Sequence, residues 1–149
     1  MVSSMRLSPE QSSVGLRVAL RIISAWEATP AQACKILRIS LSTYRRVIAD
    51  GHQCRRLDRD QQQRIGLVLG IHATLRTIFT NQANVRSFPR LKNENDFFAG
   101  GSPLEFMSQG SMISLYETFR HVEQLKLPCH QAAMSFQFLN SGGLTDATH

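Results

Sequence analysis

Hydroxyl and guanidinium side chains gather in one short stretch near residue 40, where their spacing suits contact with nucleic acid. Ser42, Thr43, Arg45 and Arg46 lie in a predicted helix that directly follows Ser40. Arginine binds guanine edges or phosphates, and serine and threonine reach either group. We therefore predict these five residues as DNA-binding, and the alternative interpretation is an ordinary helical hairpin with a solvated basic face.

The distribution of charge supports the same half of the chain. The 149 residues contain 17 Lys and Arg against 11 Asp and Glu, a formal charge of +6. Residues 1–70 carry 11 basic and 5 acidic side chains, whereas residues 71–149 carry 6 of each. An excess of positive charge favours an anionic partner. The anionic partner is therefore expected to bind the first half of the chain.

Metal binding and catalysis find little support in the sequence. His52 with Cys54 and Cys129 with His130 are the only close pairs of metal-ligating types, and neither has a second pair at ligand spacing. Glycine-rich phosphate loops, a GxSxG motif and apolar-embedded carboxylate pairs are all missing. His72 lies in an apolar stripe and is predicted to be a hydrogen-bonded core histidine. We predict no enzymatic activity, cofactor or metal.

The sequence also predicts a cytoplasmic protein without membrane contact. Its longest apolar run, Ile65–Ile71, has seven residues, compared with the roughly 20 that span a bilayer. Its first residues are polar where a signal peptide has an apolar stretch. Three widely spaced cysteines fit reduced thiols better than a disulfide framework.

Apolar periodicity and capping signals predict only helices, so the expected fold class is all-α. In the first half we expect a flexible arm over residues 1–13 and helices over 14–26, 31–37 and 41–49, the last capped by Ser40. The two short helices form a helix-turn-helix candidate. Leu41, Tyr44 and either Val47 or Ile48 are expected inside, while Arg38, Arg55 and Arg56 would widen the basic surface. Arg38 occupies the turn position where such motifs usually have glycine.

The second half has one strong local signal. Ser102, Pro103 and Glu105 form a predicted capping box at the start of a helix. Before it we expect a helix over 61–79, with Asp60 as its cap, and a linking region over 81–98. After it a helix over 112–125 carries Leu115, Phe119 and Val122 on one face. The tail carries an apolar patch at Met134, Phe136 and Phe138 that is predicted to dock on another protein.

The stretches "ALRIISAWEATPAQACKILRISLSTYRRVIADG", "LDRDQQQRIGLVLGIHATLRTIF" and "NDFFAGGSPLEFMSQGSMISLYETFRHVEQL" occur in this order between about Leu16 and Leu127. The order resembles that of antitoxins of the Xre/MbcA/ParS type. Two departures are Arg38, in place of the turn glycine, and the absence of a tryptophan often found ahead of the SPL segment.

The resemblance implies an Xre-like helix-turn-helix bundle continuous with a small helical toxin-binding domain. It places the DNA-binding region at residues 14–60 and the antitoxin domain with its tail at residues 61–149. The implied partners are operator DNA and a RES-domain, NAD-consuming toxin whose active site the antitoxin covers, with a homodimer inside the larger complex. The predicted toxin-binding residues are Gly101, Ser102, Pro103, Leu104, Met134, Phe136 and Phe138. The alternative is a stand-alone helix-turn-helix regulator whose C-terminal half dimerises.

Overall fold

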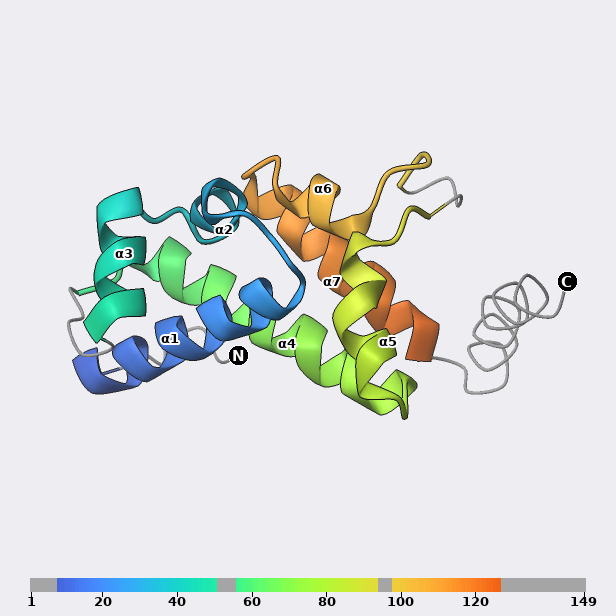
Figure 1. The fold of residues 1–149 in the computed structure, drawn as a ribbon, viewed down its shortest axis with the longest axis horizontal. Coiled ribbons are helices and arrows are strands. Elements are labelled where there is room, and N and C mark those ends of the chain that lie inside the picture. The colour runs from blue at the N-terminus through green and yellow to red at the C-terminus, as the bar shows by residue number, and fades with distance from the viewer. Residues whose placement is uncertain (1–7, 51–55, 94–97, 127–149) are drawn as a thin grey trace, which may run out of the picture.

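A computed structural model describes residues 8–50, 56–93 and 98–126. Within these residues every regular element is a helix (Figure 1), which confirms the predicted all-α class. The elements are α1 (Pro9–Ala25), α2 (Pro30–Leu37), α3 (Leu41–Asp50), α4 (Arg59–Ile78), α5 (Gln82–Ser87), the 3₁₀ turn η2 (Phe88–Arg90), α6 (Pro103–Met107) and α7 (Met112–Lys126).

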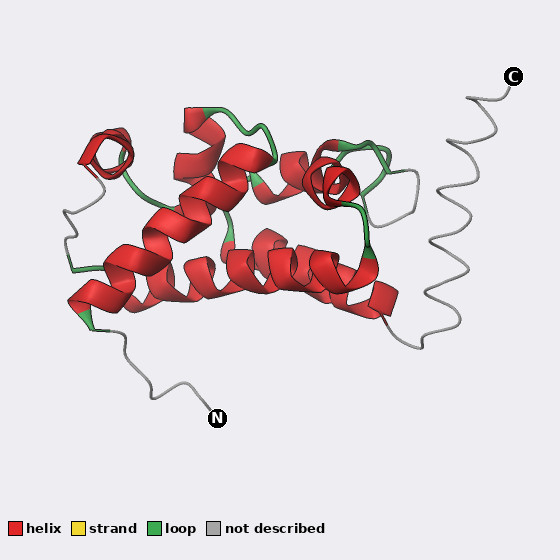
Figure 2. Cartoon of the chain, turned by 60° about the horizontal axis from the view of Figure 1, so that its bottom comes forward, coloured by secondary structure: helices red, strands yellow, loops and turns green. Residues whose placement is uncertain are grey.

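Helix α4 is the central element of the fold. Its 20 residues span about 30 Å at the α-helical rise of about 1.5 Å per residue. It packs against α1, α2, α5 and α7, and α7 runs beside it for much of its length (Figures 1 and 2). Ile65 of α4 meets Gly15 of α1, whereas Thr74 donates a hydrogen bond of 2.5 Å to Glu123 of α7. One helix therefore supports both ends of the molecule.

A single hydrophobic core joins the two halves of the chain. Its buried members come from α1 through α7 and include Trp26, Leu37, Leu75, Met107 and Leu115. Because these side chains form one contiguous cluster, the helix-turn-helix bundle is continuous with the helices that follow it.

The first helix begins at Pro9, so the predicted start at Val14 is wrong. Ser8 and Gln11 form a capping box, in which the Gln11 amide donates to Ser8 Oγ at 3.1 Å and the Ser8 amide donates to Gln11 Oε1 at 2.9 Å. Ser12 is buried, although it belongs to the segment predicted as a flexible arm. The low apolar content of this segment concealed the capping signal, which satisfies the first amides of the helix.

Two further boundaries differ from those predicted. Asp58 caps α4, while the predicted cap, Asp60, lies inside its first turn. The linking region contains α5, whose N-cap Asn81 accepts a hydrogen bond of 2.8 Å from the Ala83 amide. Val85 and Phe88 of this region are buried.

The capping box at Ser102 is confirmed. Leu115 and Val122 of α7 are buried in the core and Phe119 is partly buried against it, as expected for one face of the helix. Gly110 separates α6 from α7 with a φ of 90°, a conformation that glycine adopts without steric cost. In the part of the chain that the structure describes, the helices are too short or too polar to cross a membrane.

Candidate nucleic-acid interface

Helices α2 and α3 and the three residues between them form the predicted helix-turn-helix. Thr29 caps α2 through a capping box with Gln32, and Pro30 occupies the first helical position. At the start of α3 the Thr43 amide donates to Ser40 Oγ at 3.0 Å, which confirms Ser40 as the cap. Ser40 Oγ also donates to Thr43 Oγ1 at 3.0 Å. Ser40 and Thr43, two of the five predicted DNA-binding residues, therefore stabilise the start of α3.

The α3 helix presents a mixed face to solvent. Val47 is buried and Tyr44 half-buried, as predicted for the inner side, while Ser42, Arg45 and Arg46 are exposed. Leu41 is 43% exposed, so its predicted place inside is wrong, and Ile48 is 57% exposed, so Val47 is the inner member of the predicted pair. On a helix, positions 41, 45 and 48 follow one stripe and positions 42 and 46 follow the next. Val47 supplies the inward contact that the sequence alone could have assigned to Ile48.

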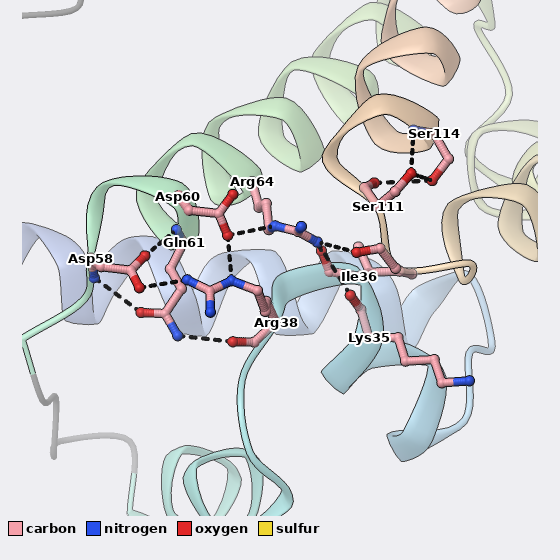
Figure 3. Close-up of polar contacts among 10 residues, drawn as sticks. Lys35, Ile36, Arg38, Asp58, Asp60, Gln61, Arg64, Ser111 and Ser114 are labelled. Carbon is pink, nitrogen blue, oxygen red and sulfur yellow. Dashed lines mark hydrogen bonds and ion pairs between the residues drawn. The ribbon is translucent and has the colours of Figure 1, made fainter.

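Arg38 ends α2 in the left-handed conformation, with φ 56° and ψ 48°. Its guanidinium pairs with Asp58, 2.5 Å away, and with Asp60, and its carbonyl accepts a hydrogen bond of 2.9 Å from Gln61 Nε2 (Figure 3). The left-handed conformation is disfavoured for a residue with a side chain, whereas glycine adopts it freely. At Arg38 the contacts with residues at the start of α4 stabilise this conformation.

These contacts also set the charge of the groups involved. The hydrogen bond from the Gln61 amide, helped by Arg38, lowers the pKa of Asp58. The hydrogen bonds to Asp60 and Asp58 raise the pKa of Arg38. Both members of the pair therefore stay ionised at neutral pH. The expectation that Arg38 widens the basic surface is wrong, because two carboxylates offset its charge.

Arg64 of α4 connects three segments and is only 4% exposed. Its Nε donates to Asp60 at 3.0 Å, and its Nη1 donates to the Ile36 carbonyl at 3.1 Å and to the Gly110 carbonyl at 2.9 Å (Figure 3). A longer contact of 3.4 Å reaches the Lys35 carbonyl. The last carbonyls of a helix have no partner within the helix, so Arg64 caps α2 and ties it to the loop before α7.

Three exposed arginines lie on and near α3. Arg45, Arg46 and Arg56 are exposed, and the ion pairs found within the described residues do not involve them. Arg55 lies outside the described residues. This arrangement can neutralise phosphates while side chains of α3 reach base edges.

Four of the residues predicted to bind a toxin are described by the structure, and three of these four are buried. Ser102 caps α6 and is buried with Pro103 and Leu104, while Gly101 is half-buried and its carbonyl accepts a hydrogen bond of 2.9 Å from the Asn93 amide. Gly101 and Ser102 form the turn that precedes α6, and Pro103 and Leu104 begin the helix. Met134, Phe136 and Phe138 lie outside the described residues.

Apolar side chains exposed on α7 were not singled out by the sequence. Ile113 is 71% exposed and Tyr116 is 45% exposed, and their spacing of three residues places them on one face. The Ser114 amide donates to Ser111 Oγ at 2.9 Å (Figure 3). This hydrogen bond stabilises the start of α7, the helix that carries both side chains. Helical spacing could have identified this pair, because Leu115 and Val122 define the opposite, buried side.

The described residues do not assemble a metal site. Groups of three or more His, Cys, Asp or Glu side chains suited to a metal ion are missing among them, and His52, Cys54, Cys129 and His130 lie outside them. Burial raises the pKa of Cys34, which keeps the thiol protonated and unreactive.

The prediction for His72 is wrong in one respect. Its Nδ1 is buried without a hydrogen-bond partner in the described structure. Burial lowers the pKa of His72, with Arg76 adding to the effect, and burial also lowers the pKa of His121. Both imidazoles are therefore held towards the neutral form.

Comparison with known proteins identifies the first half of the chain. Curated protein sequences give no match to it. Residues 5–70 match the family model of the antitoxin Xre-like helix-turn-helix domain. The matched region includes α1, α2 and α3 and extends into α4. The N-terminal part of the chain therefore carries an Xre-like helix-turn-helix domain of the kind found in antitoxins.

Proposed function

We propose that the chain is the antitoxin of a type II toxin–antitoxin system, which neutralises a RES-domain, NAD-consuming toxin and represses its own operon. The match of residues 5–70 to antitoxin Xre-like domains carries this proposal. The exposed Arg45 and Arg46 on α3 support the repressor role, since they suit contact with operator DNA. The order of segments through the second half supports the RES-type partner.

The toxin is proposed to bind the second half of the chain and to lose access to its substrate. Ser102, Pro103 and Leu104 are buried, so they shape α6, and direct contact falls to exposed groups. Ile113 and Tyr116 provide an apolar face of the kind found at the centre of protein interfaces. Neutralisation by covering the toxin requires no catalysis by this chain.

Co-expression with a RES-domain toxin tests the antitoxin role. We expect the wild-type chain to restore growth and to co-elute with the toxin, and Ile113→Asp to weaken both. Leu91→Asp is the matched control, because Leu91 is 54% exposed and lies outside α7. A stable complex in which the toxin still consumes NAD at its full rate would contradict neutralisation by covering.

A second variant separates the two roles. Arg45→Ala combined with Arg46→Ala is expected to abolish operator binding and to leave neutralisation intact. If the double variant also loses the toxin complex, these arginines do not form a separate DNA-binding face.

The alternative is a stand-alone regulator whose second half dimerises, and the same α7 face favours it because a second copy could cover Ile113 and Tyr116. This function predicts a dimer that Ile113→Asp dissociates, sequence-specific DNA binding, and no complex with a neighbouring toxin. Size measurement by light scattering, with and without the toxin, separates the two functions.

A further inference from the structure

The exposed stripe of α3 combines two aliphatic side chains with one arginine. Leu41, Arg45 and Ile48 lie at positions i, i+4 and i+7, so they line one side of the helix. Both aliphatic side chains are exposed, whereas Val47 and the half-buried Tyr44 make the inward contacts. The stripe therefore contributes little to the core and is available to a partner.

The charge of α3 selects an anionic partner for this stripe. The helix has two arginines, Arg45 and Arg46, and one acidic residue, Asp50, which is its last residue and lies beyond the stripe. A partner must therefore offer negative charge and small apolar groups at the same surface. The major groove of DNA meets this requirement, because guanine O6 and N7 accept hydrogen bonds from arginine and thymine presents its 5-methyl group.

We propose that Leu41 and Ile48 contact two thymine 5-methyl groups in the operator, on either side of the base that Arg45 reads. This inference rests on the proposed DNA-binding function and adds the bases that are recognised. Seven residues of helix cover about 10 Å, which corresponds to roughly three base-pair steps of 3.4 Å. The two T·A pairs are therefore expected about three steps apart.

Replacement of thymine by uracil tests the contact, because it removes only the methyl group. The full-length protein first selects its preferred duplex from a random-sequence DNA library. Each thymine of that duplex is then replaced singly by deoxyuridine, and the dissociation constant is measured by fluorescence anisotropy. We expect two positions about three steps apart at which binding weakens about fourfold, as expected for one buried methyl group.

Variants assign each methyl group to a side chain. Leu41→Ser should abolish the effect of deoxyuridine at one of the two positions, and Ile48→Ser at the other. Val14→Ser is the matched control, because Val14 is an exposed aliphatic residue of α1, and it should retain both effects.

The outcomes distinguish this inference from the function on which it rests. A selected duplex whose binding depends on Arg45 but not on any thymine methyl overturns the inference and leaves DNA binding intact. Retention of both effects in Leu41→Ser and Ile48→Ser overturns it as well. Failure to select any duplex overturns both the inference and the repressor role.

Discussion

Replacement of Arg64 by methionine removes the side chain that links α2, α4 and the loop before α7. The guanidinium donates to the Ile36 and Gly110 carbonyls at 3.1 and 2.9 Å. A hydrogen bond from a charged donor contributes about 1.5–3 kcal/mol, so two lost bonds cost about 3–6 kcal/mol. The apolar contacts of the methionine side chain recover part of this lost stability. Asp60 keeps its ion pair with Arg38, so no buried charge is left unpaired. We expect Arg64→Met to lower the free energy of unfolding by about 3 kcal/mol.

Urea denaturation followed by circular dichroism measures this loss. Arg76→Met is the matched control, because Arg76 is exposed on the same helix, and it should change stability by less than about 0.5 kcal/mol. Arg64→Lys should fall between the two, since an ammonium group lacks the forked geometry that reaches Asp60 and both carbonyls together. Equal denaturation midpoints for Arg64→Met and Arg76→Met would refute the role assigned to Arg64.

Glycines of α4 give a pair of opposite predictions. Gly66→Ala should stabilise the protein by about 0.5–1 kcal/mol, because a Cβ there meets nothing within 4 Å and alanine favours the helix. Gly70→Ala should destabilise it by about 1–3 kcal/mol, since the new Cβ would lie 2.7 Å from Phe119 Cε1. Thermal denaturation gives both values, and equal signs would contradict the packing argument. Stability should also fall as the pH drops through about 6.5, because His72 and His121 have lowered pKa values in the folded state and the unfolded chain binds more protons. Urea midpoints between pH 8 and pH 5 test this, and replacing both histidines by glutamine should flatten the profile.

Local signals in the sequence predict the helix starts that depend on a few neighbouring residues. The capping boxes of α2 and α6 combine Thr29 or Ser102 with a following proline, and both helices begin there. The equivalent box at Ser8 carries the same information. The segment that follows it is polar, so apolar periodicity does not indicate a helix there and the capping box is the local signal.

Contacts between distant segments explain why the rest could not be predicted. The bond from Arg64 to Gly110 joins residues 46 positions apart, and the pairs of Arg38 with Asp58 and Asp60 span 20 and 22 positions. Arg38 could be recognised as unusual in the turn, but its stabilising carboxylates depend on how α4 is placed. The choice between Val47 and Ile48 for the inner side stays open in the sequence for the same reason, because packing decides which of two adjacent β-branched residues is buried.

The boundary of the matched domain does not coincide with a boundary in the structure. The match ends at residue 70, in the middle of α4, where Gly70 faces Phe119 of α7. The hydrophobic core continues across this position, and the Gly110 carbonyl, far beyond it, accepts a hydrogen bond from the arginine that caps α2. A fragment ending at residue 70 would expose the α7 side of α4 and would remove the Gly110 carbonyl, one of the acceptors of Arg64 Nη1. The placement of α3 therefore depends on the same helices that are proposed to bind the toxin, and the two proposed functions share one folded unit.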